Sequence, residues 1–275
     1  MNLKTALLQG VQLLEDARIP APRLTAEVLL SFALRREREY LYAHPEEELT
    51  ELGWIHYGRY LHQRLKGMPT QYITGRQEFY GRDFRVTPDV LIPRPETEHV
   101  VEACLARLHP GMAAVDVGAG SGAIAATLSL ERNMPVFACD ISAAALRVAA
   151  HNARTLNARV GFVCCDLLAP FAAASIDLVV SNPPYVPLSD SETLQREVRD
   201  FEPHVALFGG PSGFEIYERL IAEARRVLKP GGWLVMELGY NSLEPVRRML
   251  AAGWREAEPI PDLTGMPRVM AAQAG

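Results

Sequence analysis

The stretch VDVGAGSGA, from Val115 to Ala123, decides the fold of this 275-residue chain, because a glycine-rich turn directly follows an apolar run. Glycine permits a tight turn and close approach of a ligand to the backbone, so the pattern is typical of a strand that ends in a nucleotide-binding loop and continues as a helix. With Ala123 in the last place it also satisfies the dinucleotide pattern GxGxx[G/A], which leaves a nicotinamide or flavin enzyme open. The candidate cofactor-binding residues here are Gly118, Ala119, Gly120, Ser121 and Gly122.

An acidic residue follows the next apolar run, which covers residues 136–139. Asp140 lies close to the offset of about 20 residues at which an acid can accept hydrogen bonds from both ribose hydroxyls of an adenosine ligand. We therefore expect Asp140 and the adjacent Ile141 to bind a cofactor. The alternative, that Asp140 only begins a helix cap, is less favoured because Ser142 can cap that helix alone.

Strands and helices alternate through the second half of the chain, which indicates a mostly parallel sheet that is covered on both faces. The tail from 254 to 272 has a turn at Leu263-Thr264-Gly265 and is expected to form an antiparallel hairpin. The expected strands cover 113–117, 136–139, 160–163, 176–180 and 233–238, and the expected helices begin at 121 and cover 142–157, 214–228 and 243–252.

Two residues after the third strand are further candidates for an adenosine site. Asp166 can accept a hydrogen bond from an adenine amino group, and Leu167 would then pack against the adenine ring. An aspartate in an exposed turn fits the same pattern, so both interpretations of Asp166 stay open.

The sequence Asn182-Pro183-Pro184-Tyr185 follows the fourth strand, at the carboxyl edge where an open α/β sheet binds its ligands. An amide or exocyclic amino nitrogen is a poor nucleophile because its lone pair is delocalised. A site for such a nitrogen must accept hydrogen bonds from its N–H groups and hold it in line with the electrophile. The Asn182 side-chain oxygen and the Pro183 carbonyl can do this, while the prolines fix the backbone.

Tyr185 offers a flat apolar face on which a planar acceptor can stack. Positioning and preorganised electrostatics would then supply the rate, without a strong general base. A rigid turn with no chemical role is the less favoured interpretation. The predicted catalytic set is Asn182, Pro183, Pro184 and Tyr185, and Asn182 is also expected to contact the cofactor.

The composition excludes several classes of protein. A net charge of -5 argues against broad contact with nucleic-acid phosphates, which normally leaves a basic surface. The four cysteines form no CxxC pair and have no matching histidine cluster, so no metal site is predicted. No signal-like start and no run near the ~20 apolar residues of a membrane span are present, so we expect a cytoplasmic protein without membrane contact.

The first part of the chain carries helical periodicity instead of strand patterns. Apolar residues at three- and four-residue spacing predict helices over 3–14, 23–34 and 45–66. Short aromatic and β-branched pieces broken by Gly75 and Gly81 then predict a hairpin over 71–86. Three prolines fix a stiff connection after it: Pro88, Pro93 and Pro95.

Two motifs resemble those of class I S-adenosylmethionine-dependent methyltransferases: Asp116 to Ala123 together with Asp140, and Asn182 to Tyr185 as the NPPY motif of their amino- and amide-methylating branch. Three further segments are similar to release factor glutamine methyltransferases, namely QYITG (71–75), VLIPRPETE (90–98) and RDFEP (199–203). The similarity covers nearly the whole chain, and the proline-rich run is more specific than either motif alone. The chain departs from the family at Leu167, where an aromatic residue is frequent, and in its tail DLTGMPR (262–268).

The resemblance implies an α/β fold: a Rossmann-like class I methyltransferase with a mostly parallel sheet and a terminal antiparallel hairpin, plus a small helical N-terminal domain. It implies S-adenosyl-L-methionine as cofactor, with S-adenosyl-L-homocysteine as product, and the glutamine amide of the Gly-Gly-Gln loop in peptide chain release factors as acceptor. We expect a substrate-recognition domain over 1–70, a linking hairpin over 71–87 and a methyltransferase domain over 88–275. The protein is expected to be a monomer without direct nucleic-acid contact.

Two other functions compete with this interpretation. A nucleic-acid adenine or guanine methyltransferase shares the NPPY chemistry but should carry a basic surface that this composition does not supply. A nicotinamide-dependent oxidoreductase fits the glycine loop and Asp140, but it gives no task to the Asn182–Tyr185 segment.

Overall fold

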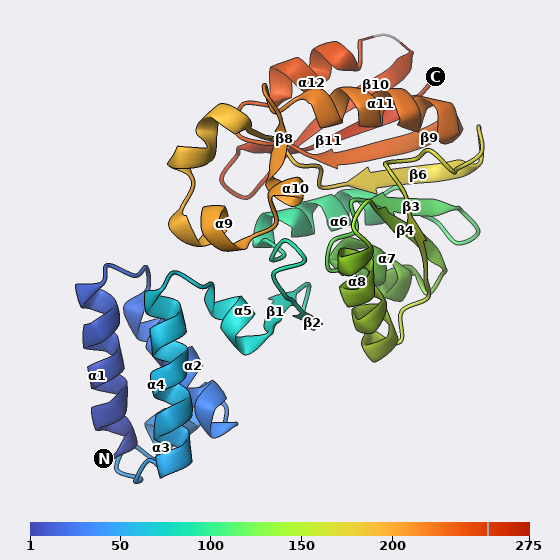
Figure 1. Cartoon of the computed structure of the whole chain (residues 1–275). Coiled ribbons are helices and arrows are strands. Elements are labelled where there is room, and N and C mark those ends of the chain that lie inside the picture. The colour runs from blue at the N-terminus through green and yellow to red at the C-terminus, as the bar shows by residue number, and fades with distance from the viewer. Residues whose placement is uncertain (252) are drawn as a thin grey trace. The chain divides into compact units, whose positions relative to one another are not determined.

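The computed structural model describes residues 1–251 and 253–275, and these residues form two compact units (Figure 1). The first unit consists of Met1–Gly75 and Gln195–Phe201. The second consists of Arg76–Leu194 and Glu202–Gly275. The short segment 195–201 therefore packs with the N-terminal part of the chain, although it lies far from that part in sequence.

The first unit is helical, which confirms the prediction for this part of the chain. Its core is formed by Leu14 of the first helix, Leu29 of the second and Tyr57 of the fourth, all fully buried. The third expected helix starts at Glu51 instead of Pro45, because the Thr50 Oγ1 accepts a hydrogen bond from the Gly53 N–H at 3.1 Å and caps it. The helices are α1 (Leu3–Asp16), α2 (Pro22–Leu34), α3 (Arg38–Ala43), α4 (Glu51–Leu65), α5 (Thr70–Thr74) and α9 (Arg196–Phe201).

The predicted hairpin is shorter than expected and opens the second unit. Its strands are β1 (Arg76–Phe79) and β2 (Arg82–Arg85), which pair in antiparallel fashion. The expectation of strand structure from residue 71 was wrong, because the chain turns into the short helix α5 after Pro69 and leaves it only at Gly75.

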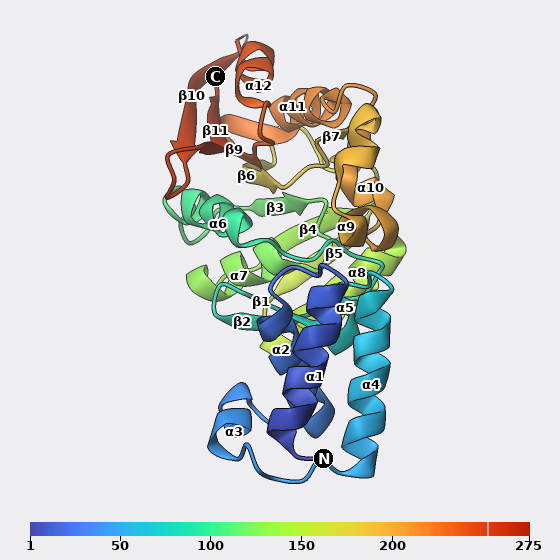
Figure 2. The same ribbon diagram turned by 90° about the vertical axis from the view of Figure 1, so that its left-hand side faces the viewer.

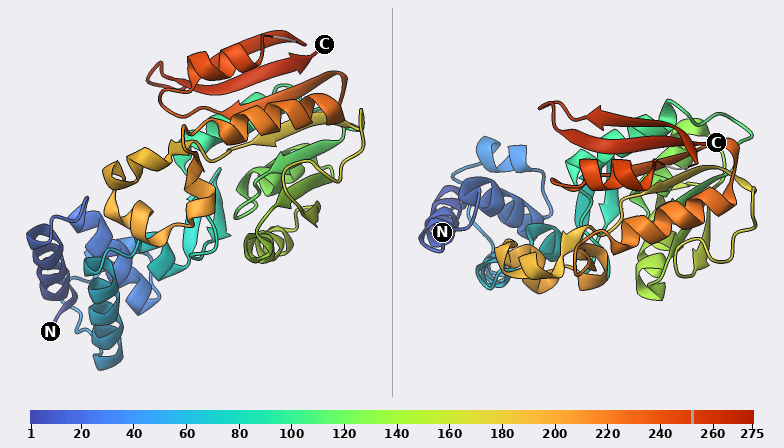
Figure 3. Two further views of the ribbon diagram at one scale, coloured as in Figure 1. Left: turned by 45° about the horizontal axis from the view of Figure 1, so that its top comes forward. Right: turned by 90° about the horizontal axis from the view of Figure 1, so that it is seen from above.

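A sheet of seven strands, counted over the described residues, forms the centre of the second unit. Figure 2 shows its strands from top to bottom in the order β10-β11-β9-β6-β3-β4-β5. The strands from β3 to β6 and β9 are parallel, whereas β11 runs antiparallel to both β9 and β10 (Figure 3). The predicted mostly parallel sheet with a terminal antiparallel hairpin is confirmed. The strands are β3 (Ala114–Val117), β4 (Val136–Asp140), β5 (Val160–Cys164), β6 (Ile176–Ser181), β9 (Leu228–Glu237), β10 (Trp254–Pro261) and β11 (Pro267–Ala274).

Helices cover both faces of this sheet, and the strands are apolar on both sides for that reason. On β6, Leu178 packs in the cluster formed with α6 and α7, while its neighbour Val179 packs in the cluster formed with α11 and α12. The expected helix over 243–252 ends at Met249, and residue 252 lies outside the described residues. The remaining elements are η1 (Pro95–Thr97), α6 (Glu98–Leu105), α7 (Ala123–Arg132), α8 (Ala143–Leu156), β7 (Val186–Pro187), η2 (Leu188–Thr193), α10 (His204–Leu207), β8 (Phe208–Gly210), α11 (Glu215–Val227) and α12 (Leu243–Met249).

The register of the parallel strands brings three loops to one place. Val117, the last residue of β3, lies opposite Cys139 of β4 and opposite Ser181 of β6. The glycine loop, Asp140 and Asn182 therefore leave the sheet at the same level of its carboxyl edge, where open α/β sheets bind ligands.

Candidate active site

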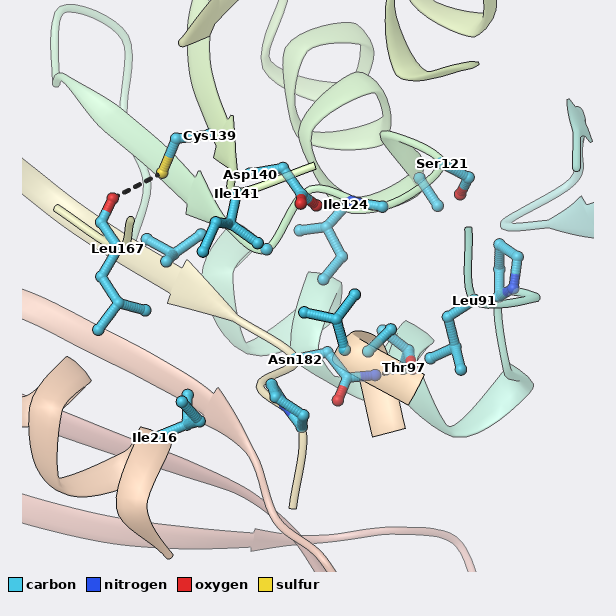
Figure 4. Close-up of a pocket in the computed structure, with 18 of the residues that line it drawn as sticks. Leu91, Thr97, Ser121, Ile124, Cys139, Asp140, Ile141, Leu167, Asn182 and Ile216 are labelled. Carbon is cyan, nitrogen blue, oxygen red and sulfur yellow. Dashed lines mark hydrogen bonds between the residues drawn. The ribbon is translucent and has the colours of Figure 1, made fainter. Parts of the chain in front are cut away.

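A pocket lies at this edge of the sheet, within the second unit (Figure 4). It contains most of the residues predicted from the sequence, whereas Ala119, Gly122, Pro183 and Tyr185 are not among its lining residues. The predicted residues that line it are Gly118, Gly120, Ser121, Asp140, Ile141, Asp166, Leu167, Asn182 and Pro184.

The glycine loop joins β3 to α7, and two of its glycines are required for different reasons. Gly120 has a φ of +54° and lines the pocket, and a Cβ there would meet only a backbone oxygen at 3.9 Å, so this space is open to a ligand. Gly122 has a φ of +79°, and a Cβ there would lie 3.0 Å from the Ala149 Cβ on α8. Gly122 therefore serves the close packing of two helices, while Gly120 faces the pocket.

The Asp140 carboxylate accepts backbone hydrogen bonds from two loops, the glycine loop and the loop that leads into α8. Its Oδ2 accepts a hydrogen bond from the Gly120 N–H at 2.9 Å, and its Oδ1 accepts one from the Ser142 N–H at 2.8 Å. The cap of α8 is supplied by Ser142, whose Oγ accepts from the Ala145 N–H at 3.1 Å. A carboxylate has about four lone-pair sites, so Asp140 keeps acceptor capacity for a ligand in the pocket.

Asp166 and Leu167 form a further part of the pocket wall. Asp166 is half-exposed and pairs with Arg219 of α11, with 2.6 Å between Oδ2 and Nη2. Leu167 has a φ of +45°, which is the left-handed region, and its carbonyl oxygen lies 3.2 Å from the Sγ atoms of both Cys139 and Cys165 (Figure 4). The two thiols, which can donate weakly, thus hold the Leu167 peptide in an uncommon conformation.

The Asn182 side chain enters the pocket from the end of β6. Its Nδ2 donates a hydrogen bond to the Thr97 Oγ1 at 3.2 Å, and the Thr97 hydroxyl donates to the Glu237 Oε2 at 2.6 Å. Figure 4 shows the Asn182 amide nitrogen directed to Thr97 and its oxygen directed away from it. Asn182 can therefore offer its oxygen to a ligand.

Tyr185 is turned toward the core of the second unit. A Cβ on Gly239 would lie 2.7 Å from the Tyr185 Cδ2, so the ring and this glycine are in close contact. Burial raises the pKa of Tyr185 to about 12. The stacking role expected for this ring is not reflected in the pocket lining and stays a prediction.

Two carboxyl groups near the pocket are almost completely buried. Asp116 is 1% exposed and Glu237 is 2% exposed, and burial raises the pKa of each to about 7 because it disfavours the charged form. The Asp116 Oδ2 accepts a hydrogen bond from the Ala125 N–H at 3.1 Å, whereas its Oδ1 finds no partner among the described residues. The charge at this edge of the sheet therefore depends on pH near neutrality.

The loop from Leu91 to Thr97 forms another wall of the pocket, and its residues had no individual role in the sequence-based prediction. Its conformation is fixed by Glu202, which is buried and accepts a hydrogen bond from the Ile92 N–H at 3.1 Å and from the Arg94 guanidinium. The proline-rich run and RDFEP both stand out in the sequence, but nothing in either segment indicates that they meet. Glu237 was missed as well, although an acid that ends an apolar strand could have indicated it.

We expect Glu202→Ala to destabilise the second unit by about 2 kcal/mol, because the Ile92 N–H and the Arg94 guanidinium lose a charged, buried acceptor. Urea unfolding measures this change. Glu244→Ala is the matched control, since its carboxylate is exposed in a surface pair with Arg247, and its effect should stay within about 0.5 kcal/mol. Equal stability of the two variants would contradict the role given to Glu202.

Together, the sheet order, the glycine loop after the first parallel strand and the pocket at the carboxyl edge define a Rossmann-like methyltransferase. Solved structures of that fold agree. A methyltransferase from Pyrococcus furiosus has a TM-score of 0.55 at 20% identity, covering 72% of this chain and 91% of that one. The catalytic domain of hMettl16 has a TM-score of 0.57 at 17% identity, covering 78% and 81%.

Matches to family models and to curated relatives identify the family more closely than these solved structures, which show only the fold. Residues 5–75 match the PrmC N-terminal domain, and residues 98–199 match the methyltransferase small domain. Release factor glutamine methyltransferases from Koribacter versatilis and Moorella thermoacetica are 48% and 43% identical, over 98% and 99% of this chain and 98% of each relative. The chain belongs to the release factor glutamine methyltransferase family.

The described residues contain no group of three or more His, Cys, Asp or Glu side chains that could hold a metal ion. Among the same residues, every helix is too short or too polar to cross a membrane.

Proposed function

We propose that this enzyme transfers the methyl group of S-adenosylmethionine to the side-chain amide nitrogen of the glutamine in the Gly-Gly-Gln motif of peptide chain release factors. The observation that carries the proposal is the orientation of Asn182, whose nitrogen is engaged by Thr97 so that its oxygen is left to accept from an acceptor amide. The names of the relatives, which are release factor glutamine methyltransferases, support the same acceptor.

The residues of the pocket fit an adenosine-containing cofactor. A Cβ on Gly118 would meet nothing within 4 Å, so the loop backbone leaves room for a ligand beside Asp140. We propose that Asp140 binds the ribose hydroxyls and that Asp166, Ile141 and Leu167 surround the adenine. Gly118 to Gly122 would provide the turn that admits the ligand. When bound, the cofactor supplies an electrophilic methyl group on a sulfonium.

The acceptor amide would be held by atoms of the NPPY segment. The Asn182 Oδ1 and the Pro183 carbonyl accept its two N–H groups, and this fixes the nitrogen and raises its electron density where the new bond forms. Pro184 lines the pocket beside Asn182. The Tyr185 ring packs against Gly239 and anchors the turn. We propose that the part of the ring surface that Gly239 leaves uncovered stacks on the planar acceptor.

We also propose a cytoplasmic monomer with no direct nucleic-acid contact. The net charge of -5 supports the last of these points, because broad contact with phosphates normally requires a basic surface. In this proposal residues 1–70 and the segment 71–87, which contains the β1–β2 hairpin, grip the release factor, and residues 88–275 carry the catalytic domain.

Labelled S-adenosylmethionine tests the acceptor directly. We expect the enzyme to label a bacterial release factor and to leave unlabelled a variant whose Gly-Gly-Gln glutamine is changed to glutamate, because a carboxylate has no N–H groups to present to Asn182 and Pro183. Equal labelling of both proteins would refute the glutamine target. Labelling of adenine- or guanine-containing RNA or DNA in parallel reactions would favour the nucleic-acid alternative.

A further inference from the structure

Three polar side chains from separate elements form one hydrogen-bonded row beside the pocket. Asn182 follows β6, Thr97 ends η1, and Glu237 ends β9. The distances are 3.2 Å from the Asn182 Nδ2 to the Thr97 Oγ1 and 2.6 Å from the Thr97 Oγ1 to the Glu237 Oε2. Thr97 is 5% exposed and Glu237 is 2% exposed, so both are withdrawn from solvent.

The number of protons in this row determines which way the Asn182 amide faces. An ionised carboxylate can only accept, so Glu237 takes the single hydroxyl proton of Thr97. The Thr97 oxygen can then only accept, and the group facing it must be the Asn182 NH₂. An asparagine amide has two nearly equivalent orientations about χ2, and the row selects between them.

We propose that Thr97 and Glu237 are positioning residues for methyl transfer, which hold the Asn182 amide with its oxygen toward the acceptor nitrogen. This inference rests on the proposed function of Asn182. Neither residue needs to touch the acceptor or the cofactor. Their contribution is to prevent the reverse orientation, in which the Asn182 NH₂ would face the N–H groups of the acceptor amide, donor against donor.

Protonation of Glu237 would reverse the row. The carboxylic acid would donate its proton to the Thr97 Oγ1, the Thr97 hydroxyl would donate to the Asn182 Oδ1, and the Asn182 NH₂ would turn to the pocket. No proton is lost within the row in this exchange; one proton is taken up from solvent.

The surroundings of Glu237 place this reversal near neutral pH. Burial is the largest cause and raises the pKa of Glu237 to about 7, although the hydrogen bond from Thr97 opposes it. Arg268 and Arg94 lower this pKa, and Glu96 raises it. Two tyrosines lie near this residue: the Tyr217 hydroxyl donates to the Glu237 backbone carbonyl at 2.7 Å, and burial, together with the charge of Glu237, raises the pKa values of both Tyr185 and Tyr217.

The first test separates positioning from binding. Thr97→Val removes the hydroxyl and keeps the shape, so we expect kcat to fall by about tenfold through misorientation, with KM and the dissociation constant of S-adenosylmethionine changed less than about threefold. Thr97→Ser, which restores a hydroxyl, should recover most of kcat. Equal loss in the Val and Ser variants would overturn the proposal, because it would show that shape and not the hydroxyl matters.

The second test uses pH. For the unmodified enzyme we expect kcat to fall toward acid with an apparent pKa near 7, since protonated Glu237 reverses the row. Glu237→Gln should flatten this fall, because the variant has no proton to gain. Burial also raises the pKa of Asp116 to about 7, so an unchanged acid limb in Glu237→Gln would show that a group other than Glu237, with Asp116 the first candidate, causes it, and this would overturn the proposal.

A third measurement does not depend on the acceptor. Titration of the side-chain carboxyl carbon of Glu237 by NMR, assigned by its loss in Glu237→Gln, should give a pKa near 7, and Thr97→Val should raise it further by removing a hydrogen bond to the charged form. If the pKa of the Glu237 carboxyl lies near the ordinary glutamate value of 4.5 in both proteins, the proposed hydrogen-bonded row of Asn182, Thr97 and Glu237 is refuted. Failure of the release factor assay with a normal titration would instead count only against the proposed function.

Discussion

Asn182→Ala is expected to lower turnover by ~100-fold or more, because the acceptor amide loses a preorganised hydrogen-bond partner at the nitrogen that reacts. The affinity for S-adenosylmethionine should change little, since the proposed contacts to the cofactor come mainly from the glycine loop and Asp140. Single-turnover methylation of a release factor measures the first quantity, and calorimetry with S-adenosylmethionine measures the second. Unchanged turnover would refute the assigned chemistry.

A matched control is available at the end of α8. Asn157 is an exposed asparagine with a φ of +59°, a conformation that glycine adopts easily. Asn157→Gly should therefore leave both turnover and stability close to those of the unmodified enzyme. A similar loss of turnover in both variants would show that Asn182→Ala acts through general damage to the fold.

Asp140→Ala is expected to weaken S-adenosylmethionine binding by ~1.5–3 kcal/mol, or roughly 10- to 150-fold, because charge-assisted hydrogen bonds to the ribose are lost. The glycine loop and the start of α8 are destabilised as well, since the N–H groups of Gly120 and Ser142 lose their acceptor. Calorimetry gives the dissociation constant. A normal constant would contradict the ribose role of Asp140.

Two further variants refine this prediction. Asp140→Asn keeps one acceptor oxygen and should weaken binding less than Asp140→Ala. Asp166→Ala removes a half-exposed carboxylate that is paired with Arg219, so its effect should be smaller than that of Asp140→Ala. If Asp166→Ala weakened binding more than Asp140→Ala, the adenine side of the pocket would dominate recognition.

The sheet could be predicted from the sequence because its signals are local. The parallel strands are apolar runs between helical patterns, and the turn around Thr264 indicates the hairpin of the tail. The short helices α3 and α5 could not be predicted in this way, because six and five residues are too few to establish a helical period. Tertiary packing and flanking residues decide such segments.

The candidate site, like the fold, was predictable only where its signals are local in sequence. Each loop at the carboxyl edge follows its strand directly, so the order of strands and helices alone was enough to place Asp140 and Asn182 beside the glycine loop. The contact of Thr97 with Glu237 spans 140 residues, and that of Tyr185 with Gly239 also joins segments distant in sequence. The hydrophobic periodicity of a sequence carries no information on contacts between residues so far apart in the chain. The directions of the side chains at the site and their hydrogen-bond partners could therefore not be predicted.

The carboxylate of Glu202 joins two segments that look like independent signatures in the sequence, the proline-rich run and RDFEP. Glu202 and the proline-rich run belong to the same compact unit and are hydrogen-bonded to each other, so a chimera between family members must inherit both from the same parent. A chimera that takes only residues 90–98 from another family member would combine a new pocket wall with the original Glu202. If the two do not fit each other, the loop should misfold locally or the enzyme should lose cofactor affinity. Paired inheritance is thus a practical rule for anyone who recombines these enzymes.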